Sequence, residues 1–237
     1  MSDLGDRVLG LVRRRIARPI LHGLRRPGIL RRMKEPSEVE LLGHRLRTSP
    51  GVFHPLDFSS SLILARHVAA LVRRETGATP IRLLDMGTGS GAIAISAAAA
   101  GATVTACDVN PSAVVLARTN VGLNGLSVEV LESDLFAAIP GRLFDVIVFN
   151  IPFYPTEPET HFEAAFRAGK GMRTVHRFAE GARHHLASGG RVIIVFSEDC
   201  DHGETLRAFS DVGFRLDDEQ VTRRALELFF VASFRLE

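Results

Sequence analysis

From residue 81 to residue 212, short apolar runs alternate with segments of helical pattern, which leaves few folds open to this chain. The apolar runs cover residues 81–86, 103–107, 127–131, 144–150 and 190–196, and the helical segments cover residues 90–100, 111–123, 174–187 and 203–212. Parallel strands need a crossover between them, usually a helix, and strands buried on both faces are continuously apolar. The alternation therefore predicts an α/β fold with a doubly wound, parallel sheet.

The C-terminal end of the sequence departs from this alternation. Residues 213–221 and 226–235 are strand-like, and only a few residues with no helical pattern join them. So short a connection requires an antiparallel hairpin. We therefore expect a Rossmann-like, mostly parallel, seven-stranded sheet with an antiparallel C-terminal strand.

The sequence before this core is basic. Residues 1–50 hold 12 Lys and Arg against 5 Asp and Glu, a net of +7, although the whole chain carries only +2. Apolar residues recur every fourth position at Val8, Val12, Ile16, Ile20 and Leu24, which predicts an amphipathic helix over residues 8–24 that Pro19 kinks or divides.

Residues 29–48 resemble a second helical stretch with a connector, and the turn-forming residues 49–51 follow. We accordingly predict a basic helical extension over residues 1–48 and a catalytic domain over residues 49–237, whose first helix, 59–76, is capped by serine. The extension could contact RNA or an anionic substrate, or simply be a solvated face.

Cysteine content argues against a disulfide framework or a zinc site. Cys107 and Cys200 are the only cysteines, and they lack paired spacing. Residues 87–107 carry no charge, but nine of these 21 residues are Gly, Ser or Thr, so we do not expect a membrane span. Together with the lack of a secretory signal pattern, this predicts a cytoplasmic protein without a metal.

A glycine-rich turn follows the first apolar run of the core, in the sequence Asp85-Met86-Gly87-Thr88-Gly89-Ser90-Gly91. Glycines permit positive φ and let a ligand approach the backbone closely, at the start of a helix where anionic or polar groups bind well. A dinucleotide site has its third glycine three positions after the second, whereas here both intervals are two. The spacing thus disfavours a nicotinamide cofactor, and Asp85 could instead hold a cationic amino group.

Acidic residues also follow the next two strands. Asp108 and Val109 end the second strand, and an acid at that point can accept hydrogen bonds from both ribose hydroxyls. After the third strand, Asp134 or the neighbouring backbone of Leu135 could contact the amino group of an adenine. Because the carboxyl ends of parallel strands meet at one sheet edge, these residues and the glycine loop predict a nucleoside-binding site.

The fourth strand runs directly into Asn150-Ile151-Pro152-Phe153. The lone pair of an amide or exocyclic amine is delocalised, so such a nitrogen is a weak nucleophile. If Asn150 Oδ1 and the Ile151 carbonyl accept hydrogen bonds from its NH₂ group, the developing charge is stabilised and the lone pair is aimed. Pro152 would stiffen this turn, and the Phe153 ring would stack on the planar acceptor.

These motifs resemble those of class I S-adenosylmethionine-dependent methyltransferases. Residues 150–153 are similar to the Asn-Pro-Pro-Tyr motif of the amino methyltransferases, and residues 49–237 most resemble the HemK/PrmC-type, small-domain group. Two looser matches are the entry segment, residues 51–55, and the glycine-rich stretch 168–172.

The resemblance implies S-adenosylmethionine as cofactor and S-adenosylhomocysteine as product. The expected donor-binding residues are Asp85, Gly87, Thr88, Gly89, Gly91, Asp108, Val109, Asp134, Leu135 and Asn150, and the expected catalytic residues are Asn150, Ile151, Pro152 and Phe153.

The resemblance makes a protein glutamine amide the preferred acceptor. An amino group of an RNA or DNA base and the nitrogen of a small metabolite remain alternatives, as does a catalytically silent donor-binding partner protein. His54, Tyr154 and His161 are open as substrate contacts. Asp199 to His202 resemble a metal cluster only superficially, and we expect them to begin a helix.

Overall fold

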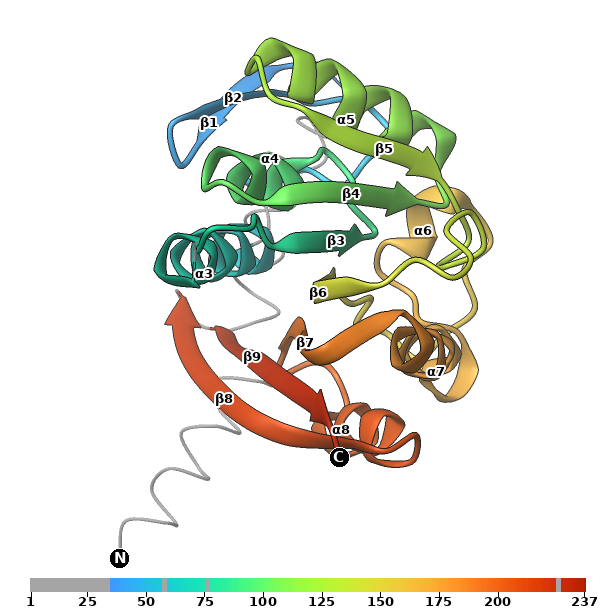
Figure 1. Cartoon of the computed structure of the whole chain (residues 1–237). Coiled ribbons are helices and arrows are strands. Elements are labelled where there is room, and N and C mark those ends of the chain that lie inside the picture. The colour runs from blue at the N-terminus through green and yellow to red at the C-terminus, as the bar shows by residue number, and fades with distance from the viewer. Residues whose placement is uncertain (1–34, 57–58, 76, 225–226) are drawn as a thin grey trace, which may run out of the picture.

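The computed structural model describes residues 35–56, 59–75, 77–224 and 227–237 (Figure 1). In chain order its elements are β1 (Glu38–Leu41), β2 (His44–Arg47), α3 (Ser59–Glu75), β3 (Arg82–Met86), α4 (Ala92–Ala99), β4 (Thr103–Asp108), α5 (Pro111–Leu123), β5 (Val128–Glu132), β6 (Phe144–Asn150), α6 (His161–Ala164), a 3₁₀ turn (Lys170–Met172), α7 (Arg173–His185), β7 (Leu186–Ser197), α8 (His202–Ser210), β8 (Phe214–Arg224) and β9 (Glu227–Leu236).

Seven of the strands form one sheet in the order β5-β4-β3-β6-β7-β9-β8. The five strands from β5 to β7 pair in parallel, whereas β9 is antiparallel to both of its neighbours. The predicted fold class is confirmed, including the antiparallel strand near the C-terminus. The order reverses at β3, and in open α/β sheets ligands bind beyond the carboxyl ends of strands at such a switch point.

Helices cover both faces of the sheet, as the opposite positions of α3 and α7 in Figure 1 show. Successive strand residues point to opposite faces. Leu83 and Val146 therefore join the buried cluster formed with α3, α4 and α5, whereas Leu84 and Ile147 join the cluster formed with α7 and α8. Burial on both faces explains why these strands are apolar along their whole length.

Residues 38–47 form a β-hairpin, and the helical prediction for this stretch is wrong. β1 and β2 pair antiparallel through the turn at Leu42 and Gly43, where both residues have positive φ, 53° and 82°. Leu41 and Leu46 are fully buried in the cluster under α3, α4 and α5. We therefore propose that the catalytic domain begins before Glu38 rather than at Ser49. The helix predicted over residues 8–24 lies outside the described residues.

The remaining differences are at element ends. α7 ends at His185 and β7 begins at Leu186, two residues before the predicted end of that helix. Within the described part of the chain, none of the helices is both long and apolar enough to span a membrane.

Candidate active site

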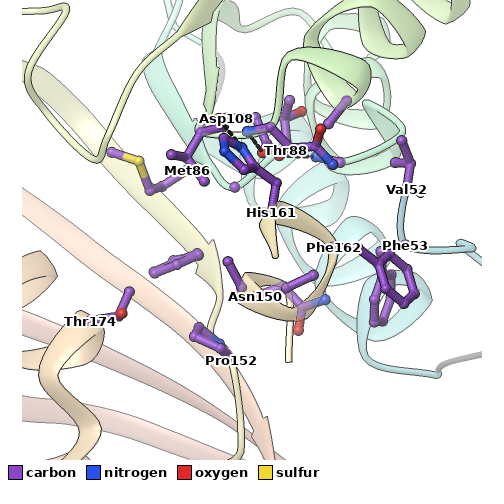
Figure 2. Close-up of a pocket in the computed structure, with 18 of the residues that line it drawn as sticks. Val52, Phe53, Met86, Thr88, Asp108, Asn150, Pro152, His161, Phe162 and Thr174 are labelled. Carbon is purple, nitrogen blue, oxygen red and sulfur yellow. Dashed lines mark hydrogen bonds between the residues drawn. The ribbon is translucent and has the colours of Figure 1, made fainter. Parts of the chain in front are cut away.

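A cavity of about 280 Å³ lies at the carboxyl ends of β3, β4 and β6 (Figure 2). The segments that follow β3, β4, β5 and β6 form its floor and walls, so the sheet brings together residues more than sixty positions apart. Those lining segments are residues 86–90, 108–110, 133–135 and 149–150, with Pro152. Two loops outside the sheet also line it, one with Gly51, Val52 and Phe53 and the other with Pro158, His161, Phe162, Ala164 and Ala165. Further lining residues come from α3, α4, α5 and α7.

The glycine loop after β3 has the conformation that its sequence predicts. Gly87, Gly89 and Gly91 have φ values of 64°, 55° and 84°, a region that other residues rarely occupy. A Cβ at Gly87 would lie 2.8 Å from the Phe149 ring, whereas one at Gly89 would meet nothing within 4 Å. Gly87 is thus required for packing under the loop, and Gly89 leaves room above it. Gly91 caps α4 and, unlike Thr88, does not line the cavity.

Asp85 lies beneath the loop rather than in the cavity wall. Its Oδ2 accepts hydrogen bonds from the Thr88 hydroxyl at 2.7 Å and the Ala94 amide at 3.1 Å. The side chain is fully buried, and Oδ1 has no hydrogen-bond partner among the described residues. Burial raises the pKa of Asp85 to about 7 despite these hydrogen bonds. The carboxyl group therefore holds the loop to the start of α4.

Asp108 is in the cavity wall, where the sequence places it. Its Oδ2 accepts from the Gly89 amide at 2.8 Å and its Oδ1 from the Asn110 amide at 2.9 Å. An ionised carboxylate has about four lone-pair positions. The positions that these bonds leave open can accept from hydroxyl donors. Burial raises the pKa of Asp108, and these backbone hydrogen bonds act in the opposite direction.

Asp134 and Leu135 also line the cavity, beyond β5. Asp134 forms an ion pair with Arg177 of α7 at 2.8 Å, and Leu135 has a positive φ of 51°. Arg177 lines the cavity as well. Sequence reasoning missed it because one arginine on an amphipathic helix is indistinguishable from its solvated neighbours.

The Asn150 side chain lies at the end of β6 and points into the cavity region (Figure 2). Its Nδ2 donates to the Ser61 hydroxyl of α3 at 3.3 Å, which fixes the direction of the amide. Its Oδ1 is buried and has no hydrogen-bond partner among the described residues. Buried acceptors in folded proteins are nearly always satisfied, so this atom indicates a donor supplied by a ligand.

The three residues after Asn150 have unequal positions. Ile151 is 1% exposed and its amide donates to the Val195 carbonyl, so its side chain belongs to the core. Pro152 lines the cavity. Phe153 instead packs against the core cluster that includes α7 and does not line the cavity. Phe153 is half-buried against that cluster, and its stacking on an acceptor stays a prediction.

The loop that contains α6 covers the cavity. His161 and Phe162 line it, and His161 Nδ1 lies 3.0 Å from the carbonyl oxygen of Val109. Because that carbonyl can only accept, Nδ1 carries the proton. Phe53 reaches the same cavity from the entry segment. Phe162 lies in no motif and Phe53 lies only in the looser entry-segment match, so sequence reasoning assigned neither ring to the site and left His161 open.

The two cysteines and the acidic cluster near α8 lie outside this site. Both thiols are free and buried, and burial raises the pKa of Cys107 to about 12 and that of Cys200 to about 11. Asp201 caps α8 by accepting from the Glu204 amide, as the helix-start interpretation predicts. Among the described residues, no group of His, Cys, Asp and Glu is arranged to hold a metal.

Comparisons with known proteins give the family. The model of the methyltransferase small domain matches residues 43–214. A Methanocaldococcus jannaschii protein described as a candidate protein N5-glutamine methyltransferase is 32% identical over 185 residues, which cover 76% of this chain and 89% of that protein. The ribosomal RNA small subunit methyltransferase C of Enterobacter is 36% identical over 67% of this chain, which spans only 42% of its length.

Among solved structures, the Thermus thermophilus 16S rRNA N2 G1207 methyltransferase, in complex with AdoMet and guanosine, has the same fold. Its TM-score is 0.62 at 21% identity, over 84% of this chain and 50% of that one. The sheet order, the glycine loop and the family match agree with one another. The chain belongs to the methyltransferase small domain family, whose members are S-adenosylmethionine-dependent methyltransferases of class I.

Proposed function

We propose that this enzyme methylates a planar nitrogen, and that its acceptor is the side-chain amide of a protein glutamine. One observation supports this most strongly: the Asn150 Oδ1 atom is a buried acceptor without a partner among the described residues, in the same cavity as the glycine loop. It is suited to accept a hydrogen bond from an NH₂ group.

The cavity residues fit S-adenosylmethionine. Open space above Gly89 leaves room for a ligand against the backbone, and Asp108 keeps lone pairs for ribose hydroxyls. Val109, Asp134 and Leu135 would surround the adenine. When bound, S-adenosylmethionine supplies an electrophilic methyl group. Asp85 would act through the loop that it supports.

Asn150 would orient the acceptor. Its Oδ1 accepts one hydrogen of the NH₂ group and stabilises the positive charge that grows on nitrogen as the N–C bond forms. Ser61 keeps the Asn150 amide from rotating. Pro152, Phe53 and Phe162 exclude water from the same space. The nitrogen would gain the methyl group as the S–CH₃ bond of the donor breaks, which leaves S-adenosylhomocysteine, and would then release one proton to solvent. No titrating base is needed for the attack.

The choice of a protein amide rests on the M. jannaschii relative, of which this chain covers 89%. An amino group of an RNA base is the second candidate, because a ribosomal RNA methyltransferase is 36% identical to this chain. A small-metabolite nitrogen has no specific support, and the unsatisfied Asn150 Oδ1 argues against a silent partner protein. We also propose a cytoplasmic location, which the two free, buried cysteines support.

Transfer of radiolabel tests both the chemistry and the acceptor. The protein is incubated with methyl-labelled S-adenosylmethionine and a cell extract, and the label is followed through protease and ribonuclease treatment. A methylated glutamine amide releases labelled methylamine on acid hydrolysis, because the amide bond is cut. Label that ribonuclease removes would refute the protein acceptor and support RNA.

Asn150→Ala tests whether the Asn150 side chain orients the acceptor nitrogen. We expect the transfer rate to fall by about 10²–10³-fold, the usual effect of losing one preorganised hydrogen bond to developing charge. Calorimetric affinity for S-adenosylmethionine should stay within a few-fold. Asn124→Ala, which removes an asparagine bonded to β2, is the matched control. Full transfer by Asn150→Ala with unchanged donor binding would contradict the mechanism.

A further inference from the structure

The position of Phe153 raises the question of which ring contacts the acceptor. Three phenylalanines line the described cavity: Phe53, Phe149 and Phe162. Phe149 is 6% exposed and packs 4.8 Å from the Phe178 ring, under the glycine loop. It is therefore part of the core, and Phe53 and Phe162 are the rings available above it.

Phe53 and Phe162 are fixed by a shared neighbour. The Phe166 ring lies 5.3 Å from Phe53 and 5.3 Å from Phe162, with interplanar angles of 44° and 68°. Phe166 does not line the cavity, so it supports the two rings from behind. Because ring contacts of this kind restrict rotation, Phe53 and Phe162 form a preorganised aromatic wall.

This aromatic wall, Phe53 with Phe162, belongs to the acceptor part of the cavity. Figure 2 shows both rings together on the side toward which the Asn150 amide extends, whereas Asp108 and Thr88 lie elsewhere in the view. Both phenylalanines are half-buried, which leaves part of each ring accessible to a ligand. The wall and Asn150, whose Oδ1 has no hydrogen-bond partner among the described residues, therefore line the same cavity.

We propose that Phe162, supported by Phe53 and Phe166, stacks on the planar acceptor group in place of Phe153. This rests on the proposed N-methyltransferase function and deepens it. A flat amide or base amine gains contact with the face of the ring while its NH₂ group reaches Asn150. The wall thus favours planar nitrogen groups, whose flat face can contact the face of the ring.

Substitutions at position 162 separate stacking from simple closure of the cavity. In the radiolabel assay at limiting acceptor, Phe162→Leu and Phe162→Ala should each lower the rate at least tenfold. Phe162→Tyr should keep most of it. Donor affinity should not change for any of them. Phe153→Leu is the competing variant, and Phe230→Leu, at a remote stacked pair, is the matched control.

The results distinguish failure of the stacking proposal from failure of the proposed function. Wild-type rates in Phe162→Leu, or a large loss confined to Phe153→Leu, would overturn the proposal. If wild-type protein labels neither protein nor RNA, it is the proposed function that fails, and a second measurement still tests the stacking.

That measurement uses the absence of tryptophan from the sequence. Phe162→Trp and Phe153→Trp each introduce a single tryptophan, which is excited apart from Tyr154. With S-adenosylhomocysteine present, we titrate each with guanosine and with N-acetylglutamine methylamide, up to the solubility of each probe. A saturable emission change at position 162, and none at 153, supports stacking. No change at 162 with either probe, or a change at 153 alone, refutes it.

Discussion

At the scale of single residues, Asp85 both supports the glycine loop and has a raised pKa. It organises the glycine loop through Thr88 and Ala94, yet burial holds its pKa near 7. The folded protein therefore binds a proton on Asp85 over a pH range where the unfolded chain, with a value near 3.8, does not. The contribution of Asp85 to stability is consequently greatest at low pH and is lost as the pH rises from about 4 to about 7.

We expect Asp85→Asn to remove this pH dependence. Relative to the wild type, the variant should become more stable as the pH rises from 4 to 8, as measured by the difference between their free energies of unfolding. The rise should be roughly 4 kcal/mol, because each pH unit between the two pKa values corresponds to about 1.4 kcal/mol. Urea denaturation at several pH values measures it. Parallel curves for the two proteins would show that Asp85 titrates normally.

Gly87 and Gly89 give a matched pair with different expected losses. Gly87→Ala brings a Cβ to 2.8 Å from the Phe149 ring at positive φ, so it should lower the free energy of unfolding by about 1–3 kcal/mol. Gly89→Ala has only backbone strain to overcome, about 1–2 kcal/mol, but its methyl group enters the open space above the glycine loop. Calorimetry should show the larger loss of donor affinity in Gly89→Ala. Equal affinities in the two variants would contradict this assignment.

At the scale of elements, Asn120 of α5 joins the β1–β2 hairpin to the glycine loop. Its Oδ1 accepts from the Arg47 amide at 2.7 Å, and its Nδ2 donates to the carbonyls of Arg47 at 3.0 Å and Ser90 at 2.8 Å. Asn120 is fully buried. One side chain thus satisfies backbone groups of both β2 and the turn before α4.

Asn120→Ala should lower the free energy of unfolding by roughly 2–4 kcal/mol, because it leaves buried backbone groups without partners. Asn124→Ala removes similar bonds to Arg45 at an exposed position and should cost about 1 kcal/mol. Denaturant midpoints compare the two. Similar losses at both positions would mean that burial of Asn120 does not decide its contribution.

The elements of the sheet were predictable because their residues are buried on both faces or flanked by clear turns. The hairpin β1–β2 was not. Its turn puts Leu42 at positive φ, where Asn or Asp is usual, and Val39, Leu42 and Leu46 have a spacing that also fits a helix. Tertiary packing of Leu41 and Leu46 decides the outcome, and local sequence does not carry that information.

The candidate site was predictable to the same extent as the sheet. Asp108, Asp134 and Asn150 follow strand ends, so the topology alone brings them to one edge. Phe53, Phe162 and Arg177 reach the cavity from loops and a helix whose paths depend on long-range packing. The direction in which Phe153 points depends on the core under α7, so its motif position was not sufficient to place it.

At the scale of the whole molecule, the stability of a shortened chain depends on whether it includes the β1–β2 hairpin. Compared with residues 35–237, residues 49–237 lack the hairpin and its two buried leucines, Leu41 and Leu46. We expect the shorter chain to be less stable by ~3–6 kcal/mol, at about 1.5–3 kcal/mol per leucine. Thermal unfolding of both chains measures this. Equal melting temperatures would show that the domain begins at Ser49, as the sequence predicts.

A role of the basic segment before Glu35 in RNA binding can be tested by comparing the full-length protein with the chain of residues 35–237. If it binds RNA, the full-length protein should retain RNA at low salt and release it steeply as salt increases, because counterions are released from the phosphates. Residues 35–237 should lack this component. Filter binding at several salt concentrations measures it. Identical salt curves for the two chains would show that the segment does not bind RNA.

The place of β9 has a consequence for how the protein is made. β9 lies between β7 and β8, although it follows both in the chain. As the polypeptide leaves the ribosome, β8 emerges with no strand beside it, and the outer edge of β7 remains open until residues 227–236 arrive. A nascent chain stalled before residue 227 therefore exposes an unpaired sheet edge, a site for aggregation or for chaperone binding. Synthesis from the N-terminus thus delays closure of this sheet until β9 inserts.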